Sequence, residues 1–216
     1  MLKVICVGYR DWALSIYKRL MDSENCLFLS MTPSNYNEDV MYDFKPDFVL
    51  FYGWSKIIRG NILNDFNCLM LHPSKLPLYR GGSPIQNQIL DGVTDSAVTI
   101  FKMDNKIDNG PIYYQKPLSL TGSLDSIFND IENIGYELTI KIFNGDYSLT
   151  AQPHDDATYC KRRKPTESEI TIDELTTQNS EYLYNKIRML ADPYPNAFIK
   201  TKDGKKILIK EVVLGD

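Results

Sequence analysis

The chain has 216 residues, of which 43% are hydrophobic and 24% are charged, and its formal net charge is -4. This size and composition fit one domain with a small appendage, or two small domains, with a real packed core. The negative charge argues against broad nucleic-acid binding, which normally needs a basic field. The one basic run, residues 161–164, is short, and such a run is usually a solvated face. We therefore expect no nucleic-acid partner.

The four cysteines are scattered without a CxxC pair, and the sequence has two histidines, His72 and His154. This spacing does not fit a structural zinc site, so we expect no metal. Residues 1–7 are too short for a signal peptide, and no apolar stretch approaches transmembrane length. We therefore expect reduced thiols, no membrane association and a cytoplasmic protein.

Short apolar runs alternate with helical patterns through the first half of the chain. The patterns predict strands over residues 3–7, 26–30, 47–52 and 67–71, and helices over residues 11–21 and 57–63. Continuous apolar strands that alternate with helices indicate an α/β fold with a mostly parallel sheet and helices on both faces. Right-handed crossovers would make this sheet Rossmann-like.

The remaining elements are predicted from the same patterns. They are helices over residues 83–90, 123–143 and 181–190, a strand pair over 97–103 and 112–117, and a second strand pair over 197–201 and 206–213. A polar stretch, residues 149–168, is interpreted as a linker. We expect a catalytic domain over residues 1–148 and a small C-terminal α+β subdomain over residues 149–216. This subdomain either shapes a binding pocket or supports a homodimer.

His72 directly follows the predicted strand 67–71, and in open α/β sheets ligands bind beyond the carboxyl ends of strands. A lone histidine is more often a packing or capping residue, but the position of His72 at the end of a strand favours a functional role. The following loop contains prolines that stiffen it and two glycines that allow close backbone approach. A second polar loop, residues 103–112, carries Asp104 and Asp108. Its composition also fits a plain turn, and the sequence leaves open which aspartate meets His72.

Two stretches resemble signatures of the 10-formyltetrahydrofolate-dependent formyltransferases. They are residues 71–81, Leu-His-Pro-Ser-Lys-Leu-Pro-Leu-Tyr-Arg-Gly, and residues 107–112, Ile-Asp-Asn-Gly-Pro-Ile, and their separation also matches. That family includes methionyl-tRNA, glycinamide ribonucleotide and sugar N-formyltransferases. Residues 160–165 and 187–198 resemble the linker and C-terminal start of the methionyl-tRNA and sugar enzymes. The turn at residues 8–11 is similar to that of the sugar enzymes.

The resemblance implies a formyl transfer that uses 10-formyltetrahydrofolate as co-substrate and needs no metal. His72 would move a proton or stabilise an oxyanion, and Asp108 would orient it. The implied folate contacts are Gly53, Trp54, Leu76, Pro77, Tyr79, Arg80, Gly81 and Gly82. The implied contacts to the acceptor are Gly8, Tyr9, Arg10 and Lys75, although such residues are more often ordinary surface residues.

The chain departs from the family at Met70, where the family normally has asparagine two residues before the histidine. A thioether cannot donate a hydrogen bond, and loss of an oxyanion donor costs about 2.7–4 kcal/mol. Three interpretations remain open. Charged His72 acts alone, or a water or another amide (Asn87, Asn105 or Asn109) replaces the donor, or the enzyme is weak.

A nucleotide-linked amino sugar is the acceptor that the resemblance favours, with the pseudaminic-acid type among the candidates. Formylation of another amine, such as an aminoacyl or peptide-synthetase substrate, is the alternative. Two competing hypotheses come from other classes: a folate-binding module without turnover, and a nicotinamide-linked oxidoreductase. The turn at residues 8–12 lacks the glycines of a dinucleotide fingerprint, which argues against the oxidoreductase.

Overall fold

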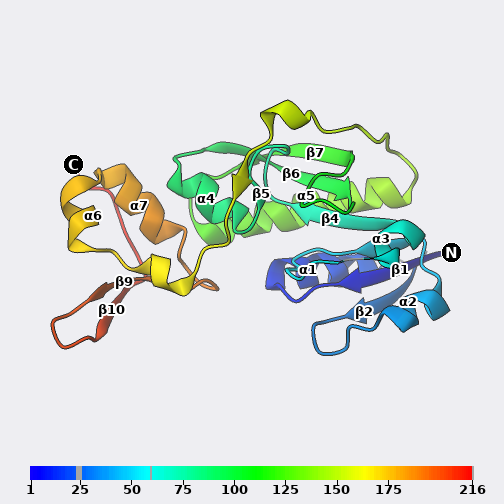
Figure 1. Ribbon diagram of the computed structural model, residues 1–216, viewed down its shortest axis with the longest axis horizontal. Coiled ribbons are helices and arrows are strands. Elements are labelled where there is room, and N and C mark those ends of the chain that lie inside the picture. Colours follow the sequence, from blue (N-terminus) through cyan, green and yellow to red (C-terminus); the bar gives the residue numbers. More distant parts are fainter. Residues whose placement is uncertain (23–25, 59, 216) are drawn as a thin grey trace.

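The computed structural model describes residues 1–22, 26–58 and 60–215, and its centre is a six-stranded sheet in the order β2-β1-β3-β4-β6-β7 (Figure 1). The strands are β1 (Leu2–Val7), β2 (Cys26–Met31), β3 (Phe48–Leu50), β4 (Cys68–His72), β6 (Asp95–Lys102) and β7 (Ile112–Ser119). The first four are mutually parallel, whereas β6 and β7 form an antiparallel hairpin beside β4. The predicted mostly parallel α/β sheet and its hairpin are confirmed.

Helices cover both faces of this sheet. On one face lie α1 (Asp11–Met21) and α5 (Leu124–Phe143), and on the other lie α2 (Glu38–Phe44) and α3 (Asn61–Asp65). Strand β1 has apolar side chains on both faces of the sheet. Val4 and Cys6 pack in the core beside α1 and α5, while Ile5 and Val7 pack in the core on the opposite face. A strand that is apolar at every position therefore needs cover on both sides.

The C-terminal elements lie at one end of the molecule (Figure 1). They are α6 (Ile172–Thr177), α7 (Ser180–Arg188) and an antiparallel hairpin of β9 (Ala197–Lys200) and β10 (Lys206–Ile209). Helix α7 packs against α4 (Pro84–Leu90), which joins this small α+β appendage to the main unit. The appendage matches the expectation, but α6 was not predicted.

Residues 149–164, which we call the strap, do not behave as a free linker. Thr150 and Ile112 exchange two backbone hydrogen bonds of 2.8 and 3.0 Å. Farther along, β8 (Tyr159–Cys160) pairs in parallel with β5 (Arg80–Gly81), in the loop that follows His72. One short 3-10 helix, η1 (His154–Asp156), lies within the strap, and a second, η2 (Pro165–Ser168), follows it directly. The predicted domain boundary between residues 148 and 149 stays a prediction, and the strap is attached to the first unit.

Gly81 is required for this attachment. Its φ is 105°, and a Cβ at this position would lie 2.4 Å from the carbonyl oxygen of Cys160. The close approach expected of this glycine is therefore made to the strap. No helix in the described ranges is long and apolar enough to span a bilayer.

Candidate active site

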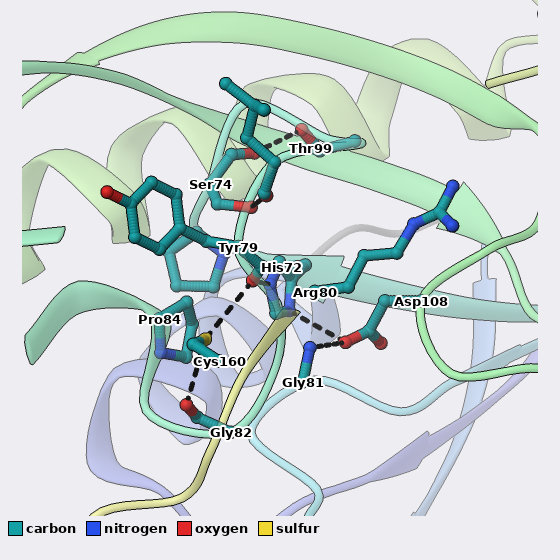
Figure 2. A network of polar contacts seen from close by, with 12 residues as sticks. His72, Ser74, Tyr79, Arg80, Gly81, Gly82, Pro84, Thr99, Asp108 and Cys160 are labelled. Atoms are coloured by element: carbon teal, nitrogen blue, oxygen red, sulfur yellow. Dashed lines mark hydrogen bonds and ion pairs between the residues drawn. The ribbon is translucent and has the colours of Figure 1, made fainter. Parts of the chain in front are cut away.

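His72 ends β4 and is held by both of its ring nitrogens. Its Nε2 lies 2.8 Å from the carbonyl oxygen of Tyr79, and its Nδ1 lies 3.6 Å from Oδ2 of Asp108 (Figure 2). A carbonyl oxygen only accepts, so Nε2 carries a proton. In the neutral ring Nδ1 then keeps its lone pair. Nδ1 is therefore the nitrogen that is available to exchange a proton.

Asp108, rather than Asp104, is the aspartate that meets His72. Oδ2 of Asp108 also accepts the backbone N–H of Gly81 at 2.7 Å, and the φ of Asp108 is 48°. Aspartate tolerates this left-handed conformation better than most residues. Asp104 instead shapes the loop, because its carboxylate accepts the N–H of Lys106 at 2.9 Å and the amide of Asn109 at 2.8 Å.

The loop after His72 is held on two sides. Thr99 of β6 donates to the carbonyl oxygen of Ser74 at 2.6 Å, and Ser74 itself donates to that of Leu78 at 2.7 Å. From α4, Gln88 donates to the carbonyl oxygen of Pro73 at 2.9 Å. A loop that is fixed in this way holds its carbonyls in place for His72.

Two cavities meet at Asp108, and the first of them also reaches His72. The first, of about 310 Å³, contains His72 and has a cationic side; the second, of about 320 Å³, has an apolar side. Both are lined by Trp54, Ser55, Met70, Gly81, Gly82, Asp108 and Arg162. A third cavity of about 440 Å³ adjoins the first through Arg10, Trp12, Pro193 and Tyr194. Two reactants can therefore approach the same pair from different sides.

Unpaired donors gather at the first cavity. In the described part of the chain, three buried side-chain donors have no hydrogen-bond partner: Trp54 Nε1, Gln86 Nε2 and Arg163 Nε. All three residues line this cavity. Because buried donors are normally paired, this cavity suits a ligand that is rich in hydrogen-bond acceptors.

Two neighbouring titratable side chains do not compete for protons. Burial raises the pKa of the Cys160 thiol, which donates to the carbonyl oxygen of Gly82 at 3.2 Å. Burial, followed by a hydrogen bond to Asp91, raises the pKa of Tyr79 to about 12. Both groups are therefore neutral near pH 7. Among the described residues, no group of three His, Cys, Asp or Glu side chains is arranged to hold a metal.

The structure divides the residues expected to contact folate. Gly53, Trp54, Gly81 and Gly82 line the first cavity, whereas Leu76, Pro77, Tyr79 and Arg80 line none of the three cavities. Arg80 is 1% exposed and its guanidinium is bound by other parts of the protein. Of the first four, Trp54, Gly81 and Gly82 also line the second cavity, whereas Gly53 does not.

The residues expected to contact the acceptor also separate. Arg10 lines the first and third cavities, and Tyr9 lines the third. Lys75 is exposed and lines none of the three cavities. Gly8 serves packing, because a Cβ there would lie 2.4 Å from the carbonyl oxygen of Tyr52.

Residues 161–164 are largely solvent-exposed, as interpreted, but three of them also border a cavity. Arg162, Arg163 and Lys164 line the first cavity, because the strap passes over Gly82. A Cβ at Gly82 would lie 2.6 Å from the backbone of Arg162. The available sequence signal was the family-like stretch 160–165, and the pairing of β8 with β5 brings it beside the loop after His72.

Two of the amides considered as replacements at Met70 are already engaged. The Asn87 amide donates to the carbonyl oxygens of residues 82, 83 and 161, and that of Asn109 donates to Asp104. Asn105 lines the second cavity. Met70 itself lines the first and second cavities, as Asp108 does.

Comparison with known proteins agrees with this geometry. A family model described as "Formyl transferase" matches residues 11–138, and one described as "Methionyl-tRNA formyltransferase, C-terminal domain" matches residues 165–211. The methionyl-tRNA formyltransferase of Kosmotoga olearia is 34% identical over 167 residues, which are 73% of this chain and 51% of that protein. The chain thus spans about half the length of this curated relative.

Solved structures share the fold. The methionyl-tRNA formyltransferase from Clostridium thermocellum has a TM-score of 0.80 at 29% identity, with 100% of both chains covered. A sugar N-formyltransferase from a Shewanella species has a TM-score of 0.76 at 17% identity, covering 99% of this chain and 100% of that one. HypX from Aquifex aeolicus, in complex with tetrahydrofolic acid, has a TM-score of 0.80 at 16% identity, covering 98% of this chain and 37% of that one. The last two likenesses concern the fold alone.

Proposed function

This chain belongs to the formyl transferase family, and on that premise we propose that it transfers a formyl group from 10-formyltetrahydrofolate to an amine of an acceptor. The observation that carries the proposal is the position of His72 and Asp108 where two cavities meet. A transfer between two bound molecules needs such a junction, because both must reach one proton-transfer group.

We place the folate in the second cavity. Its apolar side, formed by Ile57, Ile58, Phe101, Met103 and Ile107, suits a flat heteroaromatic ring. The complex of HypX, which has the same fold, with tetrahydrofolic acid supports folate as the ligand class. When bound, 10-formyltetrahydrofolate would supply the formyl group.

His72 is the group that we assign to proton transfer. The acceptor amine loses one proton in the exchange, and the departing folate nitrogen gains one. Nδ1 of His72 can take up the first proton, because Nε2 is committed to Tyr79. Oδ2 of Asp108, 3.6 Å away, then faces a positively charged ring and stabilises it by Coulomb attraction.

We place the acceptor in the first cavity and propose that it is a nucleotide-linked amino sugar. Arg10, Arg162, Arg163 and Lys164 offer cationic groups that suit a diphosphate. Gln86, a polar side chain that lines the same cavity, suits phosphate or sugar oxygens. The adjoining third cavity gives room for an extended ligand.

Methionyl-tRNA is the second candidate. It is favoured by the name of the Kosmotoga relative and by the match of residues 165–211 to a C-terminal domain of that enzyme class. The same cationic side of the first cavity would then face the phosphates of the acceptor end.

The test is turnover with 10-formyltetrahydrofolate and two sets of acceptors, read by mass spectrometry. One set contains UDP- and dTDP-linked amino sugars, and the other is methionyl-tRNA. We expect formylated product from the sugar set, reduced at least about 100-fold in His72→Ala. Product from the tRNA set alone would replace the sugar proposal. Folate binding by calorimetry without product in either set would favour the folate-binding module.

A further inference from the structure

We propose that Arg80 and Gln152 form a positioning pair that holds Asp108 in its orientation toward His72. Neither residue lines the junction of the two cavities, so both would act through Asp108. Only the kinetic part of the proposal rests on the proposed formyl transfer.

Arg80 is a buried charge without an ion-pair partner among the described residues. Its guanidinium donates to Oε1 of Gln152 at 2.6 and 3.2 Å, to Oδ1 of Asn109 at 3.2 Å and to the hydroxyl of Tyr159 at 3.1 Å. It also donates to Nδ1 of His154 at 3.2 Å, which requires that nitrogen to be unprotonated. Burying a cation among neutral acceptors is costly, and the planar, multiply donating guanidinium fixes all of these partners at once.

Gln152, which Arg80 holds in place, in turn binds the loop that contains Asp108. Its side chain is buried, and Nε2 donates to the carbonyl oxygens of Asp108 at 3.1 Å and Gly110 at 2.7 Å. Between them, Asn109 is held by Arg80 directly. Residues 108–110 are therefore bound at three consecutive positions. Asp108 needs such support, because its φ of 48° is intrinsically unfavourable.

Arg80 also fixes the other side of the pair. Its chain neighbours contact both catalytic residues, since the Tyr79 carbonyl accepts from His72 and the Gly81 N–H donates to Asp108. Figure 2 shows the Arg80 side chain extending away from His72. The anchored side chain thus fixes the backbone groups on which both His72 and Asp108 depend.

Gln152→Glu separates positioning from general stability. A glutamate still accepts from the Arg80 guanidinium, and the added charge strengthens that contact. It places an oxygen where Nε2 donated to Asp108 and Gly110, so the support of Asp108 is lost. The matched control is Tyr159→Phe, which removes an Arg80 contact from a side chain that is 64% exposed and does not contact Asp108.

We expect Gln152→Glu to lower kcat about 10- to 100-fold, because small misplacement of a catalytic group has effects of this size. Both KM values should stay within about twofold, since neither cavity loses a contact. Tyr159→Phe should keep kcat within about twofold of the wild type. An equal loss of kcat in the two variants would overturn the proposal.

Hydrogen exchange of the Gly81 amide tests the same inference without any turnover. This amide donates to Oδ2 of Asp108, so release of Asp108 exposes it. We expect exchange to be at least about tenfold faster in Gln152→Glu and unchanged in Tyr159→Phe. Unchanged Gly81 exchange in folded Gln152→Glu would overturn the positioning role, whether or not the wild type formylates anything.

Arg80→Lys is the second variant, for use if thermal melting shows that Gln152→Glu does not fold. A lysine keeps the charge but cannot bind Gln152 and Asn109 in the fork geometry of arginine. Faster Gly81 exchange in this variant would support the proposal, and protection equal to the wild type would overturn it.

Discussion

The Nε2 atom of His72 lies 2.8 Å from the carbonyl oxygen of Tyr79, seven residues farther along the chain. This contact fixes the tautomer of the neutral ring, and the ring cannot flip without losing a partly buried hydrogen bond. Tyr79 keeps its carbonyl there by adopting a φ of 57°. Nε2 is thus engaged in a structural hydrogen bond, and Nδ1 is the ring nitrogen that remains available for proton transfer.

Asp108→Asn should lower kcat about 100-fold or more while leaving folate affinity nearly unchanged. The asparagine carbonyl can still accept the Gly81 N–H, but the negative charge that faces Nδ1 of His72 is lost. Steady-state kinetics and calorimetric folate titration measure the two effects. The matched control is Asp65→Asn, at an exposed residue that accepts only from Tyr42 among the side-chain contacts described. Full activity of Asp108→Asn would contradict the assigned role.

Met70→Asn should raise kcat about tenfold, because it adds an N–H donor beside His72 where an oxyanion donor is worth more than this. Met70 lines both reactant cavities, so the new amide can reach the reacting group. Met70→Leu fills the same space without a donor and is the control. If the asparagine and leucine variants have equal kcat, the oxyanion donor is already provided by another group.

Gly110→Ala should destabilise the protein by about 1–3 kcal/mol, the usual cost of overpacking, and should also reduce activity. A Cβ on Gly110 would lie 1.8 Å from the backbone oxygen of Lys102, so the loop that carries Asp108 must move. Urea unfolding measures the first effect and turnover the second. Gly215→Ala, where no atom lies within 4 Å of the added Cβ, should match the wild type in both. Wild-type stability of Gly110→Ala would show that the loop adjusts freely.

Lys186→Met should destabilise the appendage at neutral pH by about 1.5–3 kcal/mol, the usual worth of a charged hydrogen bond. Lys186 is buried and donates to Glu174 and to the carbonyl oxygen of Glu169. Burial alone would raise the pKa of Glu174, but its hydrogen bonds from Lys186 and Thr171 lower it overall. A lowered pKa in the folded state stabilises the fold above the ordinary value of 4.5, and this stabilisation is lost as pH falls through the folded pKa.

The difference in unfolding free energy between wild type and Lys186→Met should therefore shrink below pH 4.5. Urea unfolding at several pH values follows it. Lys205→Met removes a pair whose lysine is 84% exposed, and it should have no measurable effect at any pH. A difference that is independent of pH would mean that Lys186 acts through its contact with Glu169 alone.

The elements that the sequence predicts well are those with a regular apolar face. Helix α1 was predicted with the bounds observed, and in the structure Ala13, Ile16, Tyr17 and Leu20 form its buried face. Helix α2 was missed, since only Met41 among its seven residues is buried and no periodicity is visible. Its capping residue, Asn37, was the remaining signal.

The position of His72 was predictable because it ends a strand, and the two signature stretches, which are local in sequence, pointed to Asp108 as its partner. The contacts that the strap makes with this site could not be predicted from the sequence. Gln152 and Arg163 reach it only because the strap folds back over the catalytic loop. Such an approach depends on tertiary pairing between β5 and β8, for which a two-residue strand leaves no pattern.

The pairing of β5 with β8 has a consequence for recombining members of this family. A graft that exchanges C-terminal portions at residue 148 would separate Arg80 from Gln152 and Thr158, its partners in the strap. The catalytic loop would then have to match a foreign strap that was never selected beside it. A crossover placed after Lys164 instead keeps the loop after His72 and the strap in one piece, so the pairing of β5 with β8 and the contacts of Arg80 are retained.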